Sequence, residues 1–158
     1  MRQPSRQTAT ILLALCLALA GCKQAAEEQT SGADSGGATV TSLDGTGVKQ
    51  VTLTPEAAGR LAIRTVPVRR QRVASPSGGP ASKPRTVAPY AAVVYDVNGA
   101  AWVYTMPRPL TYVRQRVSVD YVDRDLAVLT AGPAVGTAIV IEGVAELYGT
   151  EIGVGISE

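Results

Sequence analysis

The chain has 158 residues, a formal net charge of +2, two cysteines, no histidine and no phenylalanine. Without histidine, metal sites of the Cys/His kind and catalysis by Cys–His or Ser–His pairs are excluded by composition. We therefore expect no enzymatic activity, no metal ion and no other cofactor.

The first 22 residues predict export and lipid anchoring. Two arginines precede an apolar run over residues 11–20, which is too short to cross a bilayer as a helix, and small residues follow. The last four, "LAGC", resemble the lipobox of bacterial lipoproteins, whose cysteine is acylated. We interpret residues 1–21 as a lipoprotein signal peptide and Cys22 as the lipid anchor; the alternative is an ordinary secretory signal with an incidental cysteine. The predicted location is the cell envelope, facing the periplasm or the outside of the plasma membrane.

Composition divides the rest of the chain. Residues 22–48 are rich in Gly, Ser, Thr and Ala, which predicts a flexible, disordered tether. Residues 49–158 suffice for one small domain, and a Pro-, Gly- and Ser-rich loop at residues 74–85 interrupts it.

The opening of this domain predicts one short helix and one strand. Thr54 is a typical N-cap, and Pro55 and Glu56 suit the first helical turn. Gly59 is the expected end of the helix. Residues 63–73 then alternate as a strand with several arginines.

Five strands are expected after the loop, at residues 85–96, 100–105, 110–122, 126–130 and 137–142. Within 110–122, Val117, Val119 and Tyr121 share one face, as a half-buried strand requires. Short strands joined by tight turns predict a mainly β domain with short helical turns. We expect a small antiparallel barrel or sandwich of about six strands.

The stretch "PYAAVVYDVNGAAWVYT", residues 89–105, holds three of the six tyrosines and the one tryptophan around Asn98-Gly99. That pair between apolar, β-branched and aromatic residues is a strong hairpin signal. We expect this hairpin to form the core of the domain, with one face left for a partner. The candidate contact residues are Tyr95, Asn98, Trp102, Tyr104, Arg114 and Arg116.

Charge is uneven along the domain. Residues 49–89 contain eight basic residues and one acid, whereas residues 90–158 contain four and eight. Either a basic strand pairs with an acidic sheet of the same fold, or a basic patch faces anionic lipid or an acidic partner. Nothing supports nucleic-acid binding.

Carboxylates at 120, 123, 125, 142, 146 and 151 could be imagined as an acid/base pair, but Asp123 and Asp125 flank a turn, so we interpret them as solvated turn acids.

Three segments in succession carry a family resemblance. They are "VTLTPEAAGRLAIRTVPV", "APYAAVVYDVNGAAWVYT" and "PLTYVRQRVSVDYVDRDLAVLTAGPAVGTAIVIEGVAELYG". Their order resembles periplasmic adaptor subunits, or membrane fusion proteins, of resistance-nodulation-division (RND) efflux pumps, especially the heavy-metal efflux branch. In that family the opening strand and the C-terminal region come together in a β-rich membrane-proximal domain.

The chain departs from the complete family pattern between these segments. A full adaptor has a lipoyl-like domain and a long helical hairpin there, where this chain has only residues 74–85. The resemblance therefore implies the membrane-proximal, transporter-facing module, whose partner would be an RND transporter or a longer adaptor. A pump-independent envelope lipoprotein that binds a ligand or cell-wall polymer through its β-domain is the alternative.

Overall fold

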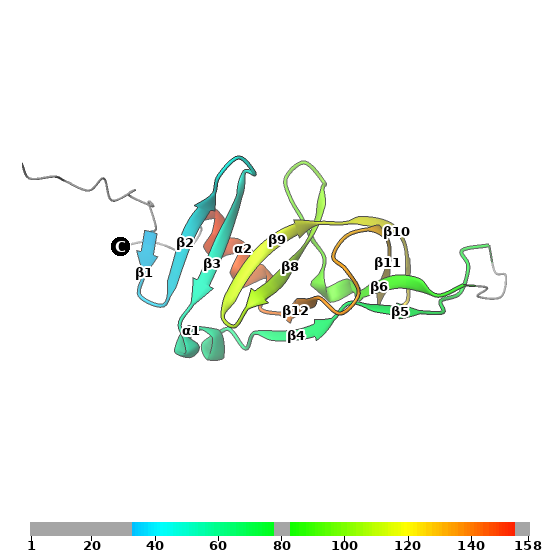
Figure 1. Ribbon diagram of the computed structural model, residues 1–158, viewed down its shortest axis with the longest axis horizontal. Coiled ribbons are helices and arrows are strands. Elements are labelled where there is room, and N and C mark those ends of the chain that lie inside the picture. The colour runs from blue at the N-terminus through cyan, green and yellow to red at the C-terminus, as the bar shows by residue number, and fades with distance from the viewer. Residues whose placement is uncertain (1–32, 78–82, 154–158) are drawn as a thin grey trace, which may run out of the picture.

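A computed structural model describes residues 33–77 and 83–153, and Cys22 lies outside them. The fold is mainly β, with antiparallel pairing throughout, as predicted (Figure 1). The larger sheet contains, in spatial order, β1 (Ala33–Ser35), β2 (Ala38–Leu43), β3 (Val48–Leu53), β9 (Thr111–Arg116), β8 (Ala101–Arg108), β12 (Ala138–Glu142) and β4 (Arg64–Pro67), with β7 (Val94–Tyr95) also paired to β8. The smaller sheet contains β10 (Ser118–Asp123), β11 (Leu126–Ala131), β6 (Arg85–Pro89) and β5 (Arg69–Gln71).

The two sheets are open, so the fold is not a closed barrel, and the described residues form twelve strands rather than about six. Three strands, β1 to β3, lie in residues where none was expected, and three more arise because each long predicted strand passes from one sheet to the other. The expected strand 110–122 breaks at buried Val117, with β9 in the larger sheet and β10 in the smaller. The expected strand 85–96 likewise becomes β6, a 3₁₀ turn (Tyr90–Ala92) and β7.

The opening segment also joins the two sheets. Its expected strand 63–73 divides into β4 and β5 at Val68, which is 1% exposed. The Val68 N–H donates to the Thr137 carbonyl at 2.9 Å, and its own carbonyl accepts from the Gly136 N–H at 2.9 Å. β4 pairs with β12 and β5 pairs with β6. The opening segment therefore pairs with strands from residue 85 onward.

Residues 33–48 correct the predicted tether, because they form β1, β2 and the start of β3. Val40 faces Val51 across the β2–β3 pair, and both side chains are buried. Gly45 and Gly47 supply positive φ angles of 72° and 65° in the connecting turn. The Ser- and Thr-rich composition suggested disorder, but threonine suits the pleated surface of a strand.

The predicted helix start is confirmed in α1 (Pro55–Arg60). The Thr54 hydroxyl accepts the Ala57 N–H at 3.2 Å, and Pro55 occupies the first turn. The helix ends one residue beyond Gly59, and Ala62 follows in a left-handed conformation at φ 49°.

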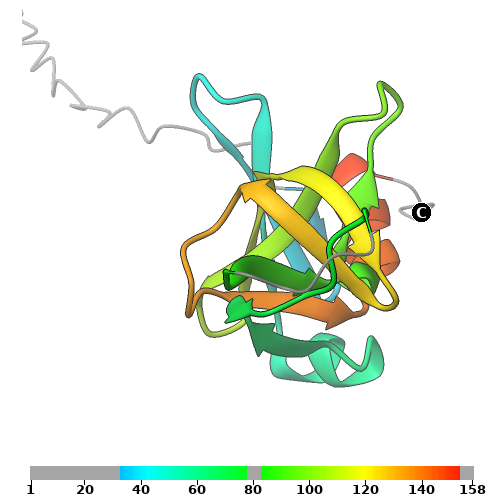
Figure 2. The same cartoon turned by 90° about the vertical axis from the view of Figure 1, so that its right-hand side faces the viewer.

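A second helix, α2 (Val144–Ile152), was not predicted. Gly143 precedes it as the N-cap residue, with a φ of 81°, and Leu147 is fully buried against the larger sheet. Its glycine and β-branched residues weaken the local helix signal, so tertiary packing determines its conformation. Figures 1 and 2 show α2 beneath the tips of the β2–β3 and β7–β8 hairpins, which project on the same side of the molecule. Among the described residues, no helix has the length and apolar character needed to cross a membrane.

Apolar packing follows this arrangement. One core lies between the larger sheet and the two helices and includes Val51, Tyr104 and Leu147. A second core fills the space where the sheets meet, around Val68, Val103 and Ile139. A third, small core lies on the smaller sheet; it consists of Val73, Val87 and Val128.

Candidate functional site

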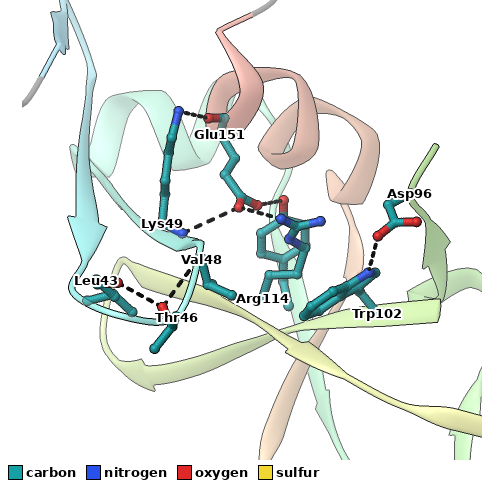
Figure 3. Close-up of polar contacts among 9 residues, drawn as sticks. Leu43, Thr46, Val48, Lys49, Asp96, Trp102, Arg114 and Glu151 are labelled. Carbon is teal, nitrogen blue, oxygen red and sulfur yellow. Dashed lines mark hydrogen bonds and ion pairs between the residues drawn. The ribbon is translucent and has the colours of Figure 1, made fainter. Parts of the chain in front are cut away.

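The predicted Asn98-Gly99 hairpin forms, and Asp96 fixes its loop. The Asp96 Oδ1 atom accepts the Asn98 N–H at 2.8 Å and the Ala100 N–H at 3.0 Å. Its Oδ2 atom accepts the indole N–H of Trp102 at 3.0 Å (Figure 3). The hydrogen bond from the Ala100 N–H is the main cause that lowers the pKa of Asp96, and the weaker effect of the bond from Trp102 acts in the same direction. One carboxylate therefore orients both the turn and the tryptophan.

Trp102 and Arg114 are in direct contact on neighbouring strands. The Arg114 guanidinium lies 4.4 Å from the centre of the Trp102 ring and 5.7 Å from that of Tyr148 on α2. Such positions over aromatic rings are favourable for a cation. Arg114 Nη2 also forms a salt bridge of 3.1 Å with Glu151 Oε1. The arginine thus links the hairpin to α2.

Glu151 lies at the centre of this polar cluster, although it is only 2% exposed. Its carboxylate accepts the Tyr104 hydroxyl and lies within 3.5 Å of the Lys49 backbone N–H. The Lys49 ammonium reaches the Glu151 carbonyl oxygen at 3.1 Å (Figure 3). Burial, reinforced by the bond to Glu151, raises the pKa of Tyr104. The carboxylate is thus surrounded by protein donors.

The cluster corrects two predicted contact residues. Tyr104 is fully buried, and the side chain of Arg114 is 12% exposed. Both lie on the face of the larger sheet where α2 packs, because register places Tyr104 opposite Arg114. They position α2 and the hairpin and are not available to a partner. They were predicted to contact a partner because no local pattern in the sequence indicates that α2 covers this face.

The other predicted contact residues remain accessible. Tyr95 is 47% exposed, Asn98 and Arg116 are exposed, and Trp102 is half-buried. Val97, which the sequence analysis did not single out, is 95% exposed at the end of the hairpin. We define the hairpin tip as Tyr95, Val97 and Asn98. It presents an aromatic and an aliphatic side chain on a loop that Asp96 holds in one conformation.

Part of the basic segment pairs with acidic residues of the same fold. Arg64 pairs with Glu142 and Arg85 with Asp120, each at 2.7 Å, so basic strands do face acidic ones. Two arginines belong to β5 and a third follows it directly; they are Arg69, Arg70 and Arg72. None of the three forms a salt bridge with another described residue. Within residues 33–77 and 83–153, no cluster of three or more potential metal ligands occurs.

No family model and no curated protein matches this chain. The resemblance to efflux adaptors therefore depends on the order of its motifs and on nothing beyond them.

Proposed function

We propose that this chain is a non-catalytic envelope lipoprotein that docks on an inner-membrane transporter of the RND type, as the membrane-proximal part of an adaptor would. The observation that supports the proposal is the pairing of β4 with β12 and of β5 with β6. It brings the opening segment and the C-terminal region into one β-rich unit, as the resemblance implies. A short loop suffices where longer relatives insert further domains.

The hairpin tip is the contact surface that this proposal requires. It projects on the same side of the molecule as the β2–β3 hairpin but well separated from it, and the polar cluster holds its strands and α2 together (Figures 1, 2 and 3). Exposed aromatic and aliphatic residues on a rigid loop bind a partner with little loss of conformational entropy. Tyr95 and Val97 would supply apolar contact area, and Arg116 would lie at the polar rim.

Co-purification from detergent-solubilised membranes tests the proposal. The tagged chain is expected to retain a transporter, and Val97→Asp is expected to reduce the yield because it places a charge in an apolar contact. Val135→Asp is the matched control, since Val135 is 52% exposed on a loop away from the tip. Cys22→Ser should leave an unprocessed or soluble form. Recovery of cell-wall polymer in place of a transporter would support the pump-independent alternative.

A further inference from the structure

The outward face of the smaller sheet carries a groove beside β5. Its volume is about 120 Å³, and it is lined by Val66, Pro67, Arg69, Gln71, Val87, Pro89 and Leu126. The register places Arg69 opposite Val87 and Pro89 opposite Leu126, so these side chains share one face of the sheet. The groove floor is thus apolar, and its rim is polar along β5.

The chain itself covers only the neighbouring part of this face. After β5, the backbone crosses the sheet, and Ala74 donates its N–H to Asp123 at 3.3 Å and accepts the Tyr121 hydroxyl at 2.8 Å. This crossing encloses the third core, which includes Val73 and Val87. Leu126 lies at the border between the enclosed core and the groove.

β5 is an edge strand, because it pairs with β6 alone among the described strands. Such a strand directs part of its backbone N–H and C=O groups away from its neighbour, where another extended segment can pair with them. An added strand would lie along the groove rim. One of its side chains could then enter the apolar floor.

The exposed arginines on and beside β5 indicate which kind of strand could pair with it. Arg69, Arg70 and Arg72 are exposed, and none pairs with a described carboxylate. A second copy of β5 would bring like charges opposite one another, which disfavours pairing between copies. An acidic strand would place carboxylates opposite these arginines.

We propose that β5 and its groove bind an extended, acidic segment of a partner protein by strand addition, with an aliphatic side chain in the groove. This site lies apart from the hairpin tip, so it goes beyond the docking proposed above.

A synthetic peptide of alternating Glu and Val, blocked at both ends, is the probe. We expect it to bind the full chain in neutral detergent, measured by fluorescence anisotropy, and the same peptide with Lys for Glu not to bind. Methylation of alternate peptide nitrogens should abolish binding, because the methyl groups remove the main-chain donors. Equal binding of the methylated peptide would exclude strand addition and overturn the proposal.

Two variants localise the site. Arg70→Ala combined with Arg72→Ala should weaken peptide binding about fivefold, as expected for exposed ion pairs. Strand alternation places Arg70 on the face of β5 away from Arg69 and the groove, where the glutamates of the peptide lie when its valines enter the groove. Arg108→Ala, which removes an exposed arginine from the distant end of β8, should leave it unchanged. If the peptide does not bind, or if the double variant binds it as the parent does, the proposal is wrong. Loss of binding to phosphatidylglycerol vesicles by the double variant of a Cys22→Ser chain, without any peptide binding, would assign the arginines to lipid.

Discussion

Arg114 on β9 and Glu151 on α2 form a salt bridge of 3.1 Å that joins the larger sheet to a helix the sequence did not predict. The two side chains are 12% and 2% exposed. A buried pair of this kind adds little net stability over apolar residues, but the loss of one partner leaves an uncompensated charge. The fold therefore depends on both residues together.

Replacing Glu151 with Ala should destabilise the protein by about 3 kcal/mol, because Arg114 would lose its carboxylate in a poorly hydrated site. Tyr104 would lose its acceptor as well. The free energy of unfolding from urea titration measures the effect. The control is Glu142→Ala, which removes an exposed salt bridge and should cost less than about 1 kcal/mol. Equal effects of the two substitutions would show that the cluster does not stabilise α2.

Stability should fall at alkaline pH because burial raises the pKa of Tyr104 above its ordinary value of 10.0. The folded state keeps the phenolic proton that the unfolded state releases. The contribution of protonated Tyr104 to the free energy of unfolding is therefore complete below about pH 10. Above pH 10 it decreases by about 1.4 kcal/mol per pH unit, until the pKa of the folded state is reached. Tyr104→Phe should flatten this slope in urea titrations at about pH 9 to 11. A slope identical to that of the parent would contradict the assignment.

Gly143 should tolerate no side chain. Its φ of 81° is unfavourable for other residues, and an added Cβ would collide with Ile63 Cδ1 and lie 3.0 Å from the Leu61 carbonyl oxygen. Gly99 has a similar φ of 76° but open space around it, so Gly99→Ala isolates the backbone cost of about 1 kcal/mol. Gly143→Ala should exceed that cost and lower the melting temperature further. Similar melting temperatures for the two variants would mean that the contact with Ile63 can relax freely.

The segment that connects β5 to β6 should accept insertions. Loop-closure entropy rises by only about 0.6 kcal/mol for each doubling of length, so Gly and Ser residues inserted after Gly79 should barely change the urea midpoint. Deleting residues 51–73 should instead cause aggregation, since it removes half of β3 and all of α1, β4 and β5 and exposes the strands they cover. A monomeric and equally stable truncated protein would contradict the adaptor-like architecture.

Local signals in the sequence sufficed for much of the fold. The Thr54 cap, the Asn98-Gly99 turn and the short apolar strand at residues 126–130 all depend on neighbours within a few positions, and each feature forms as predicted. The passage of strands between two sheets could not be predicted. It depends on buried residues such as Val68 and Val117, whose partners are distant in the chain.

The candidate site was predicted less completely for the same reason. Lys49 and Glu151 are 102 positions apart, and only the folded chain brings them into contact. Tyr104 and Arg114 were assigned to a contact surface because nothing in the sequence indicated that α2 covers them. The tip residues Tyr95 and Asn98 were found because a hairpin turn exposes its own end.

Photo-crosslinking from position 97 in intact cells tests the central claim most directly. With a photoreactive amino acid in place of Val97, we expect the lipid-anchored chain to crosslink to an RND-type transporter, identified by mass spectrometry. The same group at position 135, an exposed valine on a loop away from the tip, should not crosslink to it. A transporter adduct at neither position, or equal adducts at both, would contradict docking through the hairpin tip.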